Sequence, residues 1–373
     1  MKRLDSGFSM VELMVSITLG LMLTGAIISV FVGSRSAYQS TAGVGALADG
    51  GRFALDTIQE SARGAGFVEC NHATVNTSQV ILNMLGSPMA FDFRYGIGGY
   101  EAAGSSPGST IVLPATPVAG AAATSWTPNL DAAFASFNQQ VQGSDVLVLR
   151  SSVERAVPAY TNAVVANSAS SFVVASAASL QGGQLAVISD CTKSIVFQIG
   201  GVAGTTINLT GATGAPGNTT ASLPFGFSSG ALVSPVSTVV YYIGVGADGD
   251  SALRRLEMVN GMVTAGQYFT DEEIVPDIEN MQVLYGVDTT GTQTVSAYMT
   301  ADQVAAFVGN SASSFNAVMS VRVAVLAASP PGAATLPTAA QSFNLLGTTI
   351  KAPIDTRLRR VFDMTTTLRD SVN

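Results

Sequence analysis

The sequence predicts an α+β protein in which one long N-terminal helix packs by its second half onto an antiparallel β-sheet head. Three observations support this expectation: an apolar run at residues 8–32, apolar side chains at helical spacing over 44–62, and short β-like runs after Gly66. We therefore divide the chain into a leader (1–7), a membrane-spanning helix (8–33), an amphipathic helix (34–66) and a β-rich head (67–373).

The apolar run is long enough to cross a lipid bilayer. Its 25 residues would form roughly 37 Å of helix at ~1.5 Å per residue. A secretory signal peptide has a shorter apolar core, and Ser34-Arg35-Ser36 is a poor copy of its cleavage site. A plain signal anchor fits the hydropathy equally well, but Glu12 places a carboxylate inside the run. Such a charge is costly in hydrocarbon, so we expect Glu12 to have a partner; the alternative is that it lies at headgroup level.

The residues around Glu12 resemble the class III signal of type IV prepilins. A heptapeptide that contains Lys2 and Arg3 ends at Gly7, Phe8 follows, and Glu12 is the fifth residue after this junction. The resemblance implies that a prepilin peptidase cleaves after Gly7 and that Phe8 is then N-methylated. We expect Glu12 to face the Phe8 amine of a neighbouring subunit and so to set the register between helices during assembly. The two leader cations favour a cytoplasmic N-terminus.

Composition narrows the class of protein. The net charge is −8 with only 17 Lys and Arg residues, which argues against a nucleic-acid partner. Charged residues make up 11%, well below the usual quarter, as in an extracytoplasmic protein rich in small residues. Cys70 and Cys191 are an even pair in an exported chain and predict one disulfide across about 120 residues. Two buried free thiols are the alternative.

The second half of the helix contains an unusual number of glycines. Gly43, Gly45, Gly50 and Gly51 each weaken a helix by about 1 kcal/mol relative to alanine. This predicts a kink or a locally frayed turn near 43–51. Gly64 and Gly66 are expected to end the helix.

The head is expected to consist of short strands and turns, with one short helix at 301–307 capped by Thr300. A long loop is expected at 96–123 and a turn-rich insertion at 211–217. The expected strands are 80–84, 145–150, 171–175, 184–189, 195–199, 206–209, 236–245, 281–288 and 317–327.

Asp248-Gly249-Asp250 is expected to be a hairpin turn, and no metal site is expected. A calcium loop at Asp248 and Asp250 is the alternative. It would need six or more oxygens, and the acidic run Asp271-Glu272-Glu273, which we expect to be a solvated turn, could supply more.

Nothing in the sequence indicates an enzyme or a cofactor. The sole histidine is His72. Gly-x-Ser-x-Gly occurs at 104–108 and 226–230, but a nucleophile elbow requires a strand before it, a helix after it and a histidine later in the chain. Both matches lie in stretches rich in Gly and Ser. Trp126 is expected to contribute to packing.

Several short motifs lie beyond the apolar run. They are Gly51–Asp56, Arg63–Phe67 with Cys70, Ser189–Cys191, Val196–Gln198, Tyr241–Ile243, Leu284–Asp288, Arg359–Phe362 and Leu368-Arg369. Together they resemble the motifs of PilW-type minor pilins. This resemblance implies a minor pilin that helps to initiate type IV pilus assembly, joins a tip or priming complex with other minor pilins and the major pilin, and supports twitching motility.

The resemblance also implies where the subunit is found. It would start as a single-pass inner-membrane protein and then become part of the pilus at the cell surface. The alternatives are a J-type pseudopilin of type II secretion and a tip-displayed adhesin that binds through loops 96–143 and 200–235.

Overall fold

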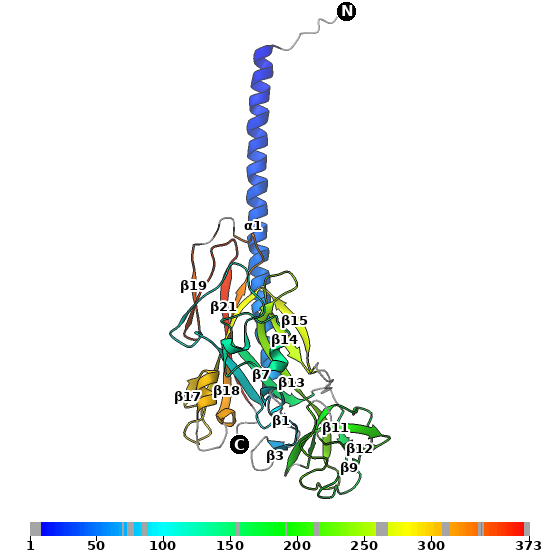
Figure 1. The fold of residues 1–373 in the computed structure, drawn as a ribbon. Helices are drawn as coiled ribbons and strands as arrows, with labels where there is room; N and C mark the ends of the chain where they lie inside the picture. The colour runs from blue at the N-terminus through cyan, green and yellow to red at the C-terminus, as the bar shows by residue number, and fades with distance from the viewer. Residues whose placement is uncertain are drawn as a thin grey trace, which may run out of the picture.

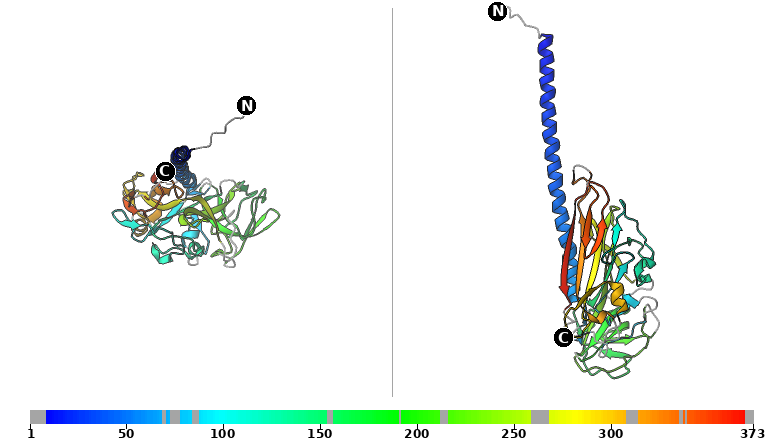
Figure 2. Two further views of the ribbon diagram at one scale, coloured as in Figure 1. Left: turned by 90° about the horizontal axis from the view of Figure 1, so that it is seen from above. Right: turned by 90° about the vertical axis from the view of Figure 1, so that its left-hand side faces the viewer.

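A single long helix projects from a β-rich head in the computed structural model (Figure 1). The first half of the helix stands clear of the rest of the chain, and its second half lies along the head (Figure 2). The expected α+β class is therefore confirmed. The structure describes residues 9–68, 71–72, 78–83, 88–153, 157–190, 192–211, 216–258, 268–307, 314–334, 337 and 339–368.

The helix α1 (Met10–Gly64) is continuous over its 55 residues. The frayed turn expected near 43–51 is wrong, because two of the glycines there serve close packing. A Cβ atom on Gly43 would lie 2.5 Å from the Cβ of Ala333, and one on Gly51 would lie 2.3 Å from the ring of Phe362. Larger residues at these positions would hold the helix away from the head.

The largest sheet runs through the middle of the head and into a distal lobe formed by its last strands (Figure 1). Apart from the parallel pair β3–β11, its strands pair antiparallel in the described part of the chain. Its main path is β6 (Trp126–Thr127), β4 (Ile97–Ala102), β7 (Val146–Ser152), β13 (Leu232–Val245), β10 (Leu185–Ser189), β11 (Ser194–Ala203), β12 (Thr206–Leu209) and β9 (Ser171–Val173). Attached to it are β14 (Ser251–Glu257), β15 (Thr270–Pro276), β3 (Ser78–Val80) and β8 (Ala159–Tyr160).

Three smaller sheets and several short helices complete the described fold. The four-stranded sheet lies against α1, and the three-stranded sheet lies next to it. The sheets are β17 (Ala297–Met299), β16 (Ile278–Val287), β18 (Val318–Ala328) and β21 (Arg359–Thr367); β19 (Ser342–Leu345), β20 (Thr348–Lys351) and β5 (Thr110–Val112); and the pair β1 (Phe67–Val68) and β2 (Asn71–His72). The helices are α2 (Pro88–Phe91), α3 (Ala132–Ala135), α4 (Ala301–Ala306), η1 (Ala123–Ser125) and η3 (Ser314–Ala317).

The second half of α1 is part of the main hydrophobic core. Leu47, Ala54, Ile58 and Ala62 recur at spacings of seven, four and four, and they pack with buried residues of β16 and β18. This is the face that the periodicity predicts. A separate core cluster fills the distal lobe.

The loop expected at 96–123 is partly wrong, because it contains β4 and β5. Gly98 and Gly99 suggested a loop, but they lie in a fully buried strand. A Cβ on Gly99 would meet the hydroxyl of Tyr285, and one on Gly98 would meet the guanidinium of Arg150. The glycines are needed for close approach across the core, which is a common reason for glycine inside a strand.

Candidate functional site

The first half of α1 is an uncovered apolar surface. The helix passes the length and composition test for a membrane span, and none of its most apolar stretch is buried in the chain. An exposed apolar surface of this extent requires lipid or other helices around it. Fifteen large apolar side chains are each more than half exposed: Met10, Val11, Leu13, Met14, Val15, Ile17, Leu19, Leu21, Met22, Leu23, Ile27, Ile28, Val30, Phe31 and Val32.

Hydroxyl groups within this apolar surface are satisfied by the helix itself. Ser16 Oγ donates to the carbonyl of Glu12 at 2.7 Å, Thr24 Oγ1 to that of Gly20 at 2.8 Å, and Ser29 Oγ to that of Ala26 at 2.9 Å. Such bonds remove the cost of placing a hydroxyl in an apolar medium. These side chains therefore do not need partners from outside the helix.

Unlike these hydroxyl groups, the carboxylate of Glu12 is not satisfied by its own helix. It lies in the first turn of α1 and is exposed, and no hydrogen bond or ion pair is recorded for it within the described part of the chain. The favourable interaction with the helix N-terminus is modest, and an ionised carboxylate in apolar surroundings is costly unless another group pairs with it. Gly7 and Phe8, which form the expected cleavage junction, lie outside the described residues.

The helix is fixed to the head by polar contacts as well as by packing. Ser61 Oγ and Tyr241 Oη lie 2.8 Å apart, and the same Tyr241 hydroxyl is 3.4 Å from the carbonyl oxygen of Thr57. Burial raises the pKa of Tyr241, although the bond with Ser61 opposes this shift. The tyrosine therefore stays neutral and joins the last turns of α1 to β13.

Two family models match this chain. Residues 240–370 match the Type IV Pilus-assembly protein W, PilW, and residues 2–28 match the Prokaryotic N-terminal methylation motif. The C-terminal part of the head is therefore similar to the PilW family, and the N-terminus carries the methylation motif. No curated protein matches it. The family comprises pilus assembly proteins, which are structural pilins and not enzymes. The methylation motif implies processing by a prepilin peptidase, and with the apolar helix it is consistent with anchoring in the membrane before entry into the pilus.

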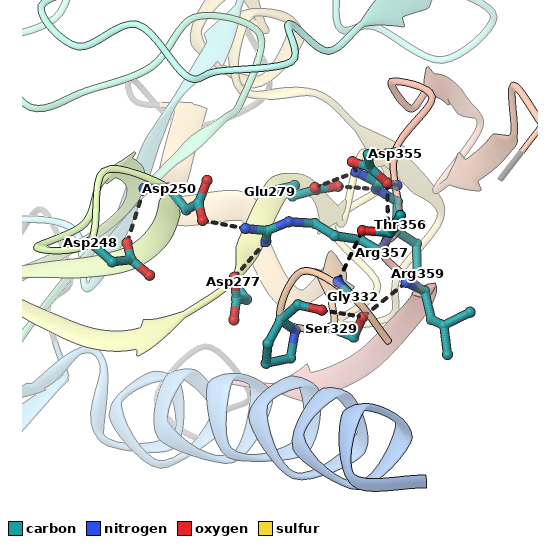
Figure 3. A network of polar contacts seen from close by, with 12 residues as sticks. Asp248, Asp250, Asp277, Glu279, Ser329, Gly332, Asp355, Thr356, Arg357 and Arg359 are labelled. Atoms are coloured by element: carbon teal, nitrogen blue, oxygen red, sulfur yellow. Dashed lines mark hydrogen bonds and ion pairs between the residues drawn. The ribbon is translucent and has the colours of Figure 1, made fainter. Parts of the chain in front are cut away.

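The PilW region contains a network of arginines and carboxylates beside α1 (Figure 3). Arg357 is ion-paired with Asp250, in the β13–β14 turn, and with Asp277 at 2.6 Å, between β15 and β16. Arg359 binds Glu279 through two bonds of 2.7 and 2.9 Å and also binds Asp355. Two guanidinium groups thus join the β13–β14 turn, the β15–β16 turn and β16 to the chain at the start of β21.

The electrostatics of this network follow from burial and pairing. Burial, with the nearby charges of Asp248 and Asp250, raises the pKa of Asp277, although Arg357 opposes the shift. Burial would also raise the pKa of Asp355, but hydrogen bonds from Arg359 and from the backbone N–H of Arg357 hold it below its usual value. Asp355 is therefore ionised in the folded chain near neutral pH.

The expected hairpin at 248–250 is confirmed, since it joins β13 to β14. Asp277 lies with Asp248 and Asp250, and oxygens of the three carboxylates lie within 4.8 Å of one another. Arg357 already supplies a positive charge to Asp250 and Asp277. The calcium alternative stays a prediction.

The expected solvated turn at 271–273 is wrong, because these residues lie in β15. Asp271 pairs with Arg254 of β14 at 2.8 Å, and Glu272 pairs with Arg255 at 3.0 Å. Cross-strand ion pairs of this kind fix the register of two strands.

The Gly-x-Ser-x-Gly sequence at 104–108 is not a nucleophile elbow. Ser105 is 1% exposed, and its hydroxyl lies 3.1 Å from Glu101 Oε1 and 3.0 Å from Asp145 Oδ1. Asp145 also accepts two backbone N–H groups, from Ala102 and Val283. Burial, followed by the charge of Asp145, raises the pKa of Glu101. Burial likewise raises the pKa of Asp145, so the two neighbouring carboxyl groups hold protons more readily than free ones. Ser105 lies between them, and the backbone bonds of Asp145 reach β4 and β16.

Several sequence predictions fall outside the description or prove to be packing. Cys70 and Cys191 lie outside the described residues, as does the side chain of His72. Trp126 is 1% exposed and donates to the carbonyl of Ser144 at 2.9 Å, so its expected packing role is confirmed. The sequence alone did not predict that Arg357 and Arg359 form ion pairs. Their spacing of two residues places both side chains on one face of an extended segment. This spacing could have indicated a shared set of acidic partners.

Proposed function

We propose that the chain is a minor pilin that helps to initiate type IV pilus assembly and then enters the pilus, within a tip or priming complex of minor pilins that also contacts the major pilin. The observation that carries this proposal is the uncovered apolar half of α1, which continues without a break into the docked half. Helices of this form can pack side by side while their heads stay outside the membrane.

Glu12 is the residue proposed to control that packing. Cleavage after Gly7 would create an amine on Phe8, and N-methylation would leave it basic. A neighbouring Glu12 could neutralise this amine, and a misplaced subunit would leave both charges unpaired in an apolar medium. The pair would therefore select register more than it would add stability.

The size of the head supports a low-copy position. Most of the 373 residues lie beyond α1, and a head of this bulk is difficult to repeat along a thin fibre. We propose that the N-terminus starts in the cytoplasm and the head in the periplasm, and that assembly moves the subunit from the inner membrane to the cell surface.

A Cys70–Cys191 disulfide is proposed within this head. In support, β3 pairs in parallel with β11, with Ser78 beside Ser194. The strands that follow the two cysteines, β3 after Cys70 and β11 after Cys191, are therefore neighbours in the large sheet. Disulfides persist in the oxidising environment outside the cytoplasm, where the head of an exported protein would lie.

The test compares Glu12→Ala and Glu12→Leu with Glu60→Ala in a strain from which the gene has been deleted. Glu60 is a second exposed carboxylate on the same helix, but it lies in the docked half. We expect the deletion to reduce surface pili and twitching, and only the Glu60 variant to restore them. Immunoblots of sheared pili would measure entry directly, and mature protein should begin at N-methyl-Phe8. Normal entry of both Glu12 variants would refute the role given to this residue.

A further inference from the structure

A cavity of about 500 Å³ opens beside the arginine network. One side is apolar and includes Ile111, Leu113 and Val118, and the other side carries Asp250, Glu279, Asp355 and the two arginines. A cavity of this size can hold a few residues of an extended chain. Because the two sides differ in chemistry, an occupant needs both apolar and polar groups.

One wall of the cavity is a strand edge. Among the described residues, β5 is the end strand of the sheet β19-β20-β5. It is bonded to β20 through Ser109 and Leu113, which pair with Thr349 and Lys351 at 2.9 Å each. Alternate residues of a parallel strand bond to the same neighbour, so the backbone groups of Val112 point away from β20. An edge of this kind accepts an added strand.

The polar wall has an excess of negative charge. Three carboxylates of the wall, those of Asp250, Glu279 and Asp355, face two guanidinium groups. One of these groups, that of Arg357, is also paired with Asp277 outside the cavity lining. The side chains of Asp250 and Asp355 are 36% and 30% exposed, so they remain accessible to another cation. The charge complementarity therefore favours a basic side chain in the cavity.

We propose that the free edge of β5 and this cavity bind an extended segment of another pilus subunit, with a lysine or arginine of that segment reaching Asp250 and Asp355. The backbone of the segment pairs with Val112, and its apolar side chains pack on Ile111 and Val118. That the partner is a pilus subunit rests on the proposed function. The preference for a basic, extended segment rests on the cavity alone.

The test uses the full chain in detergent micelles and two fluorescein-labelled, capped peptides. The probe is Thr-Val-Thr-Lys-Val-Thr-Val, and the matched peptide carries Glu in place of Lys. Fluorescence anisotropy at low salt should show that the Lys peptide binds at least about tenfold more tightly than the Glu peptide. Added salt should reduce this difference, because the charges are partly exposed.

A variant separates strand pairing from simple charge attraction. Val112→Pro removes the N–H that faces away from β20 and keeps the bonds of Ser109 and Leu113, and edge strands tolerate proline. Binding of the Lys peptide should weaken at least about tenfold. Val173→Pro is the matched control. Val173 is the exposed last residue of β9, which is another three-residue end strand. This variant should leave binding of the Lys peptide unchanged.

Equal binding of the two peptides, or no binding of either at millimolar concentration, would overturn the proposal. So would unchanged binding to a folded Val112→Pro chain, with folding checked by circular dichroism. The peptide comparison on the unaltered chain does not depend on how the variant folds. If the Glu12 variants enter pili normally, the proposed role in pilus assembly fails, but the peptide-binding results are unaffected. Failure of the proposed function and failure of the binding proposal can therefore be distinguished.

Discussion

The glycines that face the head provide a direct test of how α1 is held. In a Gly51→Ala variant, the new Cβ would lie 2.3 and 2.4 Å from two ring carbons of Phe362 and 2.9 Å from its Cγ. Ordinary van der Waals contact lies at 3.4–4 Å, so the ring has to withdraw by about 1 Å. Since Cγ itself is too close, turning the ring about its own axis does not relieve the contact. Either the half-buried Phe362 side chain leaves its position against α1, or β21 or α1 shifts.

A matched glycine on the same helix isolates the packing cost. Gly45 is exposed, and a Cβ there would meet nothing within 4 Å. Both alanine substitutions gain about 1 kcal/mol of helix propensity, and this gain cancels when the two variants are compared. Overpacking typically costs about 1–3 kcal/mol. We therefore expect Gly45→Ala to raise the free energy of unfolding and Gly51→Ala to fall about 1–3 kcal/mol below it.

Equilibrium denaturation of the full chain in detergent, followed by circular dichroism, measures both free energies of unfolding. The fluorescence of Trp126, the sole tryptophan, provides a second probe inside the head. If Gly51→Ala proves as stable as Gly45→Ala, the helix does not approach β21 as closely as argued. In that case the continuity of α1 through 43–51 would need another explanation.

Three further variants test the buried charges and the cysteines. Burial raises the pKa of Glu101 to about 8 from 4.5. Between these two pH values the folded chain keeps a proton that the unfolded chain releases. The free energy of unfolding therefore falls as the pH rises from the lower value to the higher one. Glu101→Gln should show a flatter profile between about pH 5 and pH 8 in denaturation experiments. Arg359→Met removes the guanidinium group that Glu279 and Asp355 share and should cost about 3 kcal/mol in the same assay. A much smaller loss would show that solvent screens these charges. Cys70→Ser or a reductant should lower stability by about 4 kcal/mol, and mass spectrometry of alkylated protein would reveal free thiols if the bond does not form.

Local patterns predicted much of the fold. The helical spacing of Leu47, Ala54 and Ile58 identified the docked face of α1, and apolar runs identified β7, β10, β12 and β18 close to their observed bounds. The capping box at Thr300 and Gln303 likewise matches the expected short helix. These signals depend on neighbours along the chain, so one sequence is enough to recognise them.

The errors have a common physical origin in contacts between distant segments. Gly98 and Gly99 resemble loop residues until Arg150 and Tyr285 are placed against them. Arg359 lies 80 positions from Glu279, and no local pattern connects the two. The free edge of β5 depends on its pairing with β20, more than 200 positions away. Such features require the tertiary structure.

The family match falls on the part of the head that packs against α1 and leaves out the distal lobe. Residues 240–370 include β15, β16, β18 and β21, which are strands that contact α1 or share its core cluster. The distal lobe around β9 to β12 has its own core cluster, so its side chains can change without altering how the helix is held. β21 carries Phe362 against Gly51 and begins at Arg359 in the polar network. The same strand therefore links the packing of α1 to the arginine network.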